Sequence, residues 1–340
     1  MDFSYIELQY RKEEEFLSPF AFPSQNTKGR EKPIVPCELR TDFQRDRDRI
    51  IHSKSFRRLM HKTQCFLSPE GDHYRTRLTH TLEVSQIGRS VARLLRLNED
   101  LVEAASLGHD LGHTPFGHAG ERVLNELCPD GFSHNEQSLR TVRILERDGE
   151  GLNLTYEVCD AILCHTGKTP AQTVEGRLIK YADRIAYINH DIDDAIRAGI
   201  LTDNSIPEEY SRILGHDHSH RIDTMVKSLV RGTLQNFENG IAELKMEPEV
   251  EEATRGLREF MFENVYINSL AKKEESKACD LLAAMYRYFV AHPEKMPEDN
   301  RRMLESFSTE RVVCDYIAGM TDRYALEKYN ELFIPRMWGQ

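Results

Sequence analysis

Hydrophobic residues recur at helical spacing along nearly all of the chain after residue 41. In the segment 74–96 one apolar stripe returns every three or four positions, as an amphipathic helix requires. The alternation typical of strands is scarce, apart from a short hairpin that we expect around residues 62–73. We therefore predict an all-α fold, with helices over residues 42–61, 74–96, 98–111, 116–127, 134–147, 155–165, 175–198, 220–238, 249–290 (broken near 269) and 309–333.

Two stretches of the chain break this pattern. The first forty residues carry an acidic cluster at residues 13–15 followed by prolines and a glycine, which predicts a poorly structured, extended segment. Residues 202–220 are rich in turn-forming side chains and predict a loop between two helical layers. We expect an N-terminal extended segment over residues 1–40, a core over residues 41–200, and a helical C-terminal part over residues 201–340 that packs on the core.

Composition narrows the class of protein. The 340 residues include 45 Lys and Arg against 56 Asp and Glu, a net charge of −11, which argues against a generic nucleic-acid binder but leaves room for a local basic pocket. The sequence shows neither an apolar run long enough to span a membrane nor a secretory signal. Its 7 cysteines never occur in C-x-x-C spacing, so we expect no disulfide framework or thiolate zinc site, and a cytoplasmic protein fits best.

Candidate chemistry is concentrated between residues 73 and 134, where histidines are frequent. The run 108–121 is interrupted by glycines and a proline, which predicts one helix ending near Gly112 and another beginning near Pro115. Such a junction can direct the side chains on both sides of it toward one cavity. The polar side chains concerned are His109, Asp110, His118 and Glu121, the last two of which share one helical face.

Two further helices carry polar groups whose interpretation stays open. His80 lies on the buried stripe of its helix, and periodicity alone favours a core histidine over a ligand. Asp183, Tyr187 and Asp191 share one face of the helix 175–198, which is either a solvated face or the lining of a cavity. A site of two histidines and two aspartates suits a divalent ion with open coordination positions, namely Mn²⁺, Mg²⁺, Fe²⁺, Ni²⁺ or Zn²⁺.

The order of these residues resembles a known superfamily. His80, the pair His109-Asp110 and Asp183 match the H…HD…D pattern of the HD-domain metal-dependent phosphohydrolases. Longer blocks are similar to one family within it, the deoxyguanosine triphosphate triphosphohydrolases. These blocks are residues 40–59, 62–64, 74–80, 109–121, 132–138 and 313–322.

The resemblance implies an HD-domain helical bundle with additional C-terminal helices, which hydrolyses deoxynucleoside triphosphates to deoxynucleoside and inorganic triphosphate. It makes His80, His109, Asp110 and Asp183 the metal ligands. His118 and Glu121 correspond to the catalytic pair that follows the HD motif, and His134 to a supporting histidine. His118 can supply a proton to the poorly departing sugar 5′-oxygen if Glu121 orients its ring, although the sequence does not separate acid from base.

The same resemblance implies substrate contacts and partners. Arg77 and Arg184 lie close to the expected ligands and are candidates for holding phosphate. Tyr187 and Asp191 match positions that read the sugar, and Gln64 is a further sugar or base contact. The family also implies a homo-oligomer, either a hexamer or a tetramer, with room for an activating deoxynucleotide between subunits and for single-stranded DNA as a partner, and no membrane association. The preferred base and the native metal stay open.

Two other functions compete with this interpretation. An HD-type nucleotidase or phosphodiesterase would share the metal ligands, but would not be expected to carry the block 40–64 or the pair His118 and Glu121. A nucleotide-sensing or single-strand-binding protein with vestigial activity would not need all the ligands and both acid–base candidates. Metal-dependent release of triphosphate from deoxynucleotides distinguishes the three.

Overall fold

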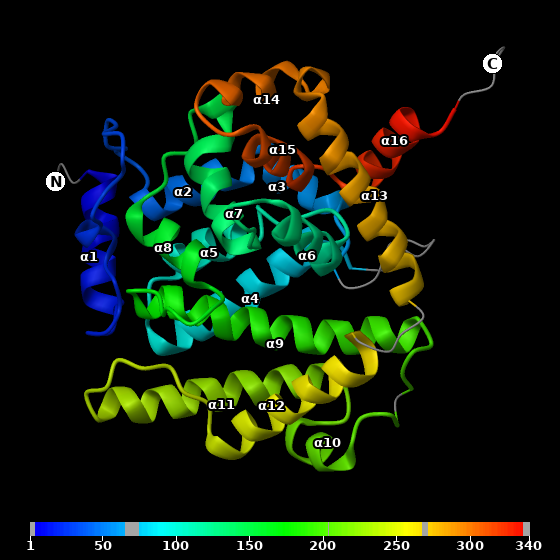
Figure 1. Ribbon diagram of the computed structural model, residues 1–340. Helices are drawn as coiled ribbons and strands as arrows, with labels where there is room; N and C mark the ends of the chain where they lie inside the picture. Colours follow the sequence, from blue (N-terminus) through cyan, green and yellow to red (C-terminus); the bar gives the residue numbers. More distant parts are fainter. Residues whose placement is uncertain (1–3, 65–74, 203, 267–270, 336–340) are drawn as a thin grey trace.

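The computed structural model describes residues 4–64, 75–202, 204–266 and 271–335, and these are overwhelmingly helical (Figure 1). Their only β pairing consists of two isolated bridges, so the all-α prediction is confirmed. The α-helices are α1 (Tyr5–Phe16), α2 (Asp42–Ile51), α3 (Lys54–Arg58), α4 (Arg77–Leu95), α5 (Glu99–Gly108), α6 (Gly117–Leu127), α7 (His134–Arg140), α8 (Tyr156–Cys164), α9 (Val174–Arg197), α10 (Glu208–Leu214), α11 (His218–Glu238), α12 (Pro248–Met261), α13 (Ala271–Ala291), α14 (Glu298–Arg302), α15 (Thr309–Ala318) and α16 (Asp322–Phe333).

The long helix α9 is the centre of the largest hydrophobic core. It runs across the molecule with α4 and α5 on one side and α10–α12 on the other (Figure 1). Its apolar stripe, which includes Leu178, Ala182 and Ile185, is fully buried between these layers. Gly88 lets α4 approach closely, since a Cβ atom there would lie 2.9 Å from the Val102 side chain of α5.

The helices after residue 201 pack in two different places. Helices α10–α12 complete the core around α9. Helices α13, α15 and α16 form a separate core with α6, in which Leu124 and Leu282 are fully buried. Helix α6 follows directly after the histidine-rich run, so the second core holds one wall of the candidate site in place.

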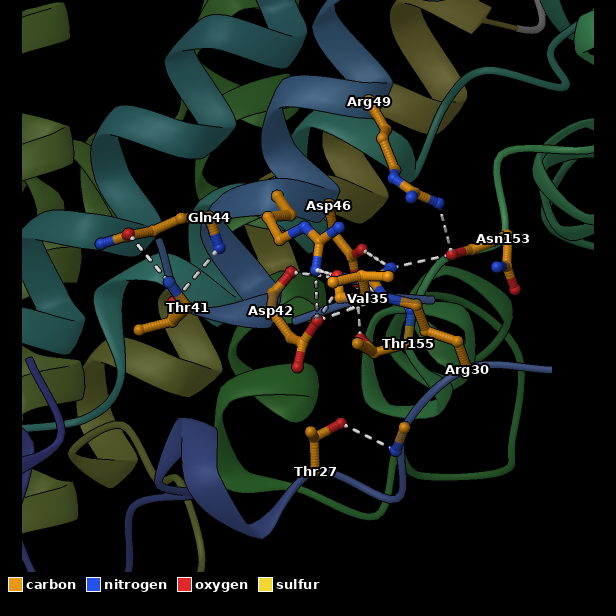
Figure 2. A network of polar contacts seen from close by, with 12 residues as sticks. Thr27, Arg30, Val35, Thr41, Asp42, Gln44, Asp46, Arg49, Asn153 and Thr155 are labelled. Carbon is orange, nitrogen blue, oxygen red and sulfur yellow. Dashed lines mark hydrogen bonds and ion pairs between the residues drawn. The ribbon is translucent and has the colours of Figure 1, made fainter. Parts of the chain in front are cut away.

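A buried polar network ties the N-terminal segment to the third core, which is built on α2, α5 and α8 (Figure 2). The Arg30 guanidinium donates to Asp42 Oδ1 at 2.8 Å and is also ion-paired with Asp46. The other Asp46 oxygen accepts from the backbone nitrogen and hydroxyl of Thr155, at 2.8 and 2.7 Å. Each buried charge in this network therefore has several partners, as stable burial requires.

The first forty residues are more ordered than the sequence indicated, and the prediction of a poorly structured segment is wrong for α1. Ser4 caps this helix by accepting from the Glu7 amide. Glu13, one of the residues of the acidic cluster, accepts from the amide and hydroxyl of Ser24 at 2.7 and 2.5 Å. These contacts stabilise a helix that buries none of its residues, and so carries little hydrophobic signal.

Other predicted boundaries also change. The helix expected over 42–61 is interrupted at His52, because Ser53 caps a new helix by accepting from the Phe56 amide. The loop expected over 202–220 contains α10, whose first turn carries Glu208 and Glu209 at the positive end of the helix dipole. Most of the hairpin expected around 62–73 lies outside the described residues. Among the described helices, none combines the length and the apolarity needed to span a bilayer.

Candidate metal centre and active site

Helices α4, α5 and α9 bring all four predicted metal ligands together. His80 lies in the first turns of α4, which starts at a capping box formed by Thr76 and Thr79. His109 is the residue that ends α5, with Asp110 directly after it, and Asp183 lies on α9. His80, His109 and Asp110 are buried, and ligand atoms of all three lie within 4.8 Å of one another. Asp183 Oδ1 is 3.1 Å from His80 Nε2 and 4.0 Å from His109 Nε2.

The charges in this cluster favour ionised carboxylates. Arg77 Nη1 lies 2.5 Å from Asp110 Oδ2. Burial works against the charged form of Asp110, but the Arg77 guanidinium outweighs it and holds the pKa of that carboxyl well below its usual range. Burial likewise opposes ionisation of Asp183, while the contact with His80 favours it, and the pKa falls to about 2. Both carboxylates are therefore anionic near neutral pH and can act as metal ligands.

The ring of His109 has the orientation and tautomer of a metal ligand. Its Nδ1 lies 2.6 Å from the carbonyl oxygen of Ser106, which can only accept, so Nδ1 carries the proton. Its Nε2 is buried and has no hydrogen-bond partner among the described residues. A buried nitrogen lone pair beside two carboxylates is costly unless a cation satisfies it. The two-histidine, two-carboxylate set fits a divalent transition metal or Mg²⁺.

A second group, on α6 and α7, lies beside the cluster. It consists of His118, Glu121 and His134. The Glu121 carboxylate connects the two histidines, with Oε2 3.1 Å from His118 Nδ1 and Oε1 2.8 Å from His134 Nδ1. Burial opposes ionisation of Glu121, but the hydrogen bonds with His118 and His134 dominate and lower its pKa. The His118 side chain is 79% exposed, so its ring is accessible from solvent. The structure therefore brings all three predicted acid–base residues together.

Two buried histidines next to this group were not predicted as site residues. His113, for which the sequence favours neither a helix-end role nor a functional one, stacks on His134 with ring centroids 4.9 Å apart. His165 ends α8, and its Nε2 lies 3.2 Å from His134 Nε2. Its sequence signal is a histidine placed directly after an apolar helical run, as is His109.

The loop between α5 and α6 is clamped from a distance. The amine of Lys62 donates to the carbonyl oxygens of His113 and Ala318, and burial, with a smaller effect from Arg58, lowers the pKa of that amine to about 7. The Asp322 carboxylate accepts from the amide of Phe116 at 2.9 Å. Gly112 allows this loop to press against α7, because a Cβ atom there would lie 2.1 Å from the Ser138 nitrogen.

The predicted substrate contacts have different surroundings. Tyr187 and Asp191 lie one and two turns after Asp183 on α9; Asp191 is buried, Tyr187 is half-buried, and burial raises the pKa of Tyr187 to about 12. Gln64 approaches Arg77 through its backbone oxygen, and its side-chain Oε1 is buried. Arg184 makes a bidentate ion pair with Glu251 of α12, at 2.6 and 2.8 Å, and not with the histidine cluster.

Comparisons with known proteins show which domains and family the chain matches. Residues 77–188 match the HD domain, and residues 244–331 match a phosphohydrolase-associated domain. The chain is 55% identical to a deoxyguanosinetriphosphate triphosphohydrolase-like protein of Caldanaerobacter subterraneus subsp. tengcongensis, over 98% of this chain and 95% of the relative. Proteins with the same description from Clostridium tetani and Desulfatibacillum aliphaticivorans are 49% and 48% identical, over 94% and 96% of this chain and 93% and 97% of those relatives.

The solved structure of a hypothetical protein from Aquifex aeolicus is similar over 86% of this chain and 68% of that one, with a TM-score of 0.48 and 19% identity. The HD domain covers His80, the pair His109-Asp110 and Asp183, so the cluster described above lies wholly within it. Identity to the relatives extends over nearly the whole chain. The chain therefore belongs to the family of deoxyguanosinetriphosphate triphosphohydrolase-like proteins and carries the HD phosphohydrolase domain of that family.

Proposed function

We propose that this protein hydrolyses deoxynucleoside triphosphates, dGTP among them, to deoxynucleoside and inorganic triphosphate. The observation that carries the proposal is the position of the His118–Glu121–His134 group beside the buried cluster of His80, His109 and Asp110. One group supplies ligands for a divalent cation and the other supplies a proton. Relatives described as deoxyguanosinetriphosphate triphosphohydrolase-like support the same substrate class.

The candidates for phosphate binding are the positive charges close to the predicted metal ligands. When bound by His80, His109, Asp110 and Asp183, a divalent cation supplies Lewis-acid polarisation of a phosphoryl oxygen. Arg77, held against Asp110 at the start of α4, brings a positive charge next to the predicted ligands. Its Nε has no hydrogen-bond partner among the described residues, which makes it the candidate for a phosphate contact. Arg184 has a weaker claim, because its guanidinium pairs with Glu251 of α12 and contacts none of the predicted ligands.

Proton transfer is assigned to His118. The leaving group is the 5′-oxygen of the sugar, a poor leaving group unless it is protonated. The Glu121 carboxylate holds His118 Nδ1, which leaves Nε2 free to give a proton to that oxygen. His134, bonded to the other oxygen of Glu121 and also through its backbone amide, fixes the carboxylate in place.

The sugar is assigned to the face of α9 beyond Asp183. Tyr187 lies one turn, about 5.4 Å, further along the helix, where its ring would cover C2′ and leave no room for a 2′-hydroxyl. Asp191, a further turn along, can accept a hydrogen bond from the 3′-hydroxyl.

The test is metal-dependent turnover of each deoxynucleotide, alone and in pairs, with the phosphate product identified. We expect triphosphate release with Mg²⁺ or Mn²⁺, and loss of both turnover and bound metal in Asp110→Ala, because this change removes an anionic ligand. Release of monophosphate would instead indicate a nucleotidase or phosphodiesterase. Asp110→Ala with full activity and metal content would contradict the ligand assignment.

A further inference from the structure

We propose that a cavity between α3, the turn at residues 147–149 and helices α14–α16 binds a small molecule that carries a phosphate group. The cavity has a volume of about 440 Å³, which is in the range of small-molecule sites. Its lining includes none of the four predicted metal ligands, nor His118, Glu121 or His134. The cavity is therefore separate from the candidate active site.

The charges that line this cavity are unequally paired. The buried Glu146 carboxylate accepts from the first two backbone amides of α3, at 3.1 and 2.7 Å. Asp315, buried on α15, is ion-paired with Arg140 at 2.7 Å. Arg58 and Arg147 also line the cavity, but neither forms an ion pair with a described residue. Two guanidinium groups are therefore available to an incoming anion.

The remaining charges of the lining do not neutralise these arginines. The Lys54 amine lies 3.1 Å from Asp148, and since both side chains are exposed, the pair is weak and easily exchanged. Asp299 of α14 is the one other acid in the lining, and it is exposed. It can accept a hydrogen bond from a hydroxyl group of the ligand. The lining therefore favours an anion that also carries hydroxyl groups.

The backbone that presents Arg147 to the cavity is strained. Three consecutive residues have positive φ angles, namely 54° at Arg147, 58° at Asp148 and 100° at Gly149. This region is unfavourable for any residue with a Cβ atom, so the first two positions are held there at a cost. Such strain is typical of ligand-binding segments, where it directs a side chain toward the ligand. Here it directs a free guanidinium to the cavity wall.

Phosphate fits these groups better than a carboxylate does. A guanidinium pairs two N–H groups with two anionic oxygens, so one arginine satisfies a carboxylate, whereas the three terminal oxygens of a phosphate ester suit two arginines. The volume leaves room for a further group the size of a sugar. A sugar phosphate and inorganic triphosphate share this chemistry, and the experiment distinguishes them.

The cavity also adjoins the loop that leads to the active site. Leu111 and Gly112, directly after Asp110, line it. So does Lys62, whose amine donates to the carbonyl oxygens of His113 and Ala318. A ligand bound here would contact this loop without touching the metal ligands. The binding itself does not depend on the proposed function.

The experiment measures binding to the full-length, metal-containing protein by isothermal titration calorimetry. The probes are ribose 5-phosphate, inorganic phosphate, inorganic triphosphate and, as the uncharged control, ribose. We expect saturable binding of ribose 5-phosphate at one site per chain, and none of ribose. Tighter binding of triphosphate, weakened by the variants below, would identify the inorganic anion as the ligand.

Arg58→Gln and Arg147→Gly should each weaken this binding about 10- to 100-fold, because each removes a charge-assisted hydrogen bond. Glycine tolerates positive φ, so Arg147→Gly should keep or raise the melting temperature and cannot lose binding by unfolding.

Two matched variants control for local effects. Arg57→Gln removes the neighbouring arginine, which donates to the His52 carbonyl oxygen and does not line the cavity. Asp148→Gly relieves the same backbone and keeps Arg147. Both should bind ribose 5-phosphate as the wild type does. No binding of any phosphate probe, or binding that Arg58→Gln and Arg147→Gly leave unchanged, would overturn the site. Because binding is the readout, either result leaves deoxynucleotide turnover as a separate question.

Discussion

Two buried polar regions of this molecule differ in how fully their groups are paired. In the network of Figure 2, Arg30, Asp46 and Thr155 satisfy one another, and Arg49 donates to the carbonyl oxygens of Leu152 and Asn153 at 2.6 and 2.9 Å. In the metal centre, by contrast, buried nitrogens of several histidines have no hydrogen-bond partner among the described residues. These are His80 Nδ1, His109 Nε2 and His113 Nδ1.

This difference in hydrogen bonding distinguishes a polar network that stabilises the fold from one that is suited to bind a ligand, and it does so from the structure alone. An unpaired buried polar group costs about 1–3 kcal/mol, so folding alone gives no reason to collect several of them in one place. The groups of the Figure 2 network satisfy one another, whereas the histidine cluster leaves buried nitrogens that a bound ligand would satisfy, as the proposed function requires. The predictions below test this division, from the largest expected effect to the smallest.

His118→Ala should remove activity without removing stability. We expect kcat to fall about 10²- to 10⁴-fold, the usual contribution of a positioned proton donor, with metal content unchanged. Its control is His220→Ala, since His220 is also an exposed histidine paired with an acid three residues away, at 2.5 Å from Asp217, but lies outside the site. Loss of metal in His118→Ala would instead make this residue a ligand or a structural group.

Asp46→Ala, in the Figure 2 network, should reduce the stability of the fold. The change leaves the buried Arg30 guanidinium and the Thr155 donors without their main partner, and should reduce the free energy of unfolding by about 3–5 kcal/mol. Asp42→Ala is the matched control, since Asp42 contacts the same arginine but its side chain is 33% exposed, and a smaller loss is expected. Urea unfolding measures both. Equal losses would mean that burial does not govern the strength of this network.

Tyr187→Ala tests whether the face of α9 beyond Asp183 contacts the sugar. If the ring excludes a 2′-hydroxyl by overpacking, worth about 1–3 kcal/mol, its removal should raise the kcat/KM ratio of GTP to dGTP by about 5- to 150-fold. The ratio is measured in wild type and variant with the same metal. A ratio that stays constant would leave Tyr187 as a packing residue.

The buried amine of Lys62 should make the stability of the protein depend on pH. Burial lowers the pKa of its amine from 10.5 to about 7, so between these values the unfolded chain holds more protons than the folded one. Stability of the wild type should therefore rise with pH across this window relative to Lys62→Met, by up to about 1.4 kcal/mol per pH unit. Parallel stability curves for the two proteins, measured by urea unfolding, would contradict the shift.

Much of the helical fold and of the candidate site could be predicted from the sequence because the local patterns were strong. The 3.6-residue periodicity placed His80 on a buried face, and the glycine-rich junction placed His109 and Asp110 at a helix end. The structure brings these three residues together, as the resemblance to the HD-domain phosphohydrolases implied and as periodicity alone did not.

Other features depend on contacts that no local pattern encodes. Arg184 meets Glu251 across 67 residues, so a position next to an expected ligand did not reveal its partner. His165 acquires its neighbours only when α8 packs against α5 and α7. Helix α1 was missed because it buries no residue and depends on polar contacts such as that of Glu13 with Ser24.

The clamp on the loop between α5 and α6 has a consequence for biosynthesis. Phe116 and its partner Asp322 are separated by 206 residues, and Lys62 reaches Ala318 across 256. Because translation proceeds from the N-terminus, a nascent chain can fold the helices of the HD domain well before residues 318–322 leave the ribosome. Until then the loop that carries Asp110 and leads into His118 lacks the Asp322 carboxylate, and the Lys62 amine that contacts this loop lacks Ala318 as its second acceptor. Activity should therefore appear late in synthesis, after these distant residues have docked.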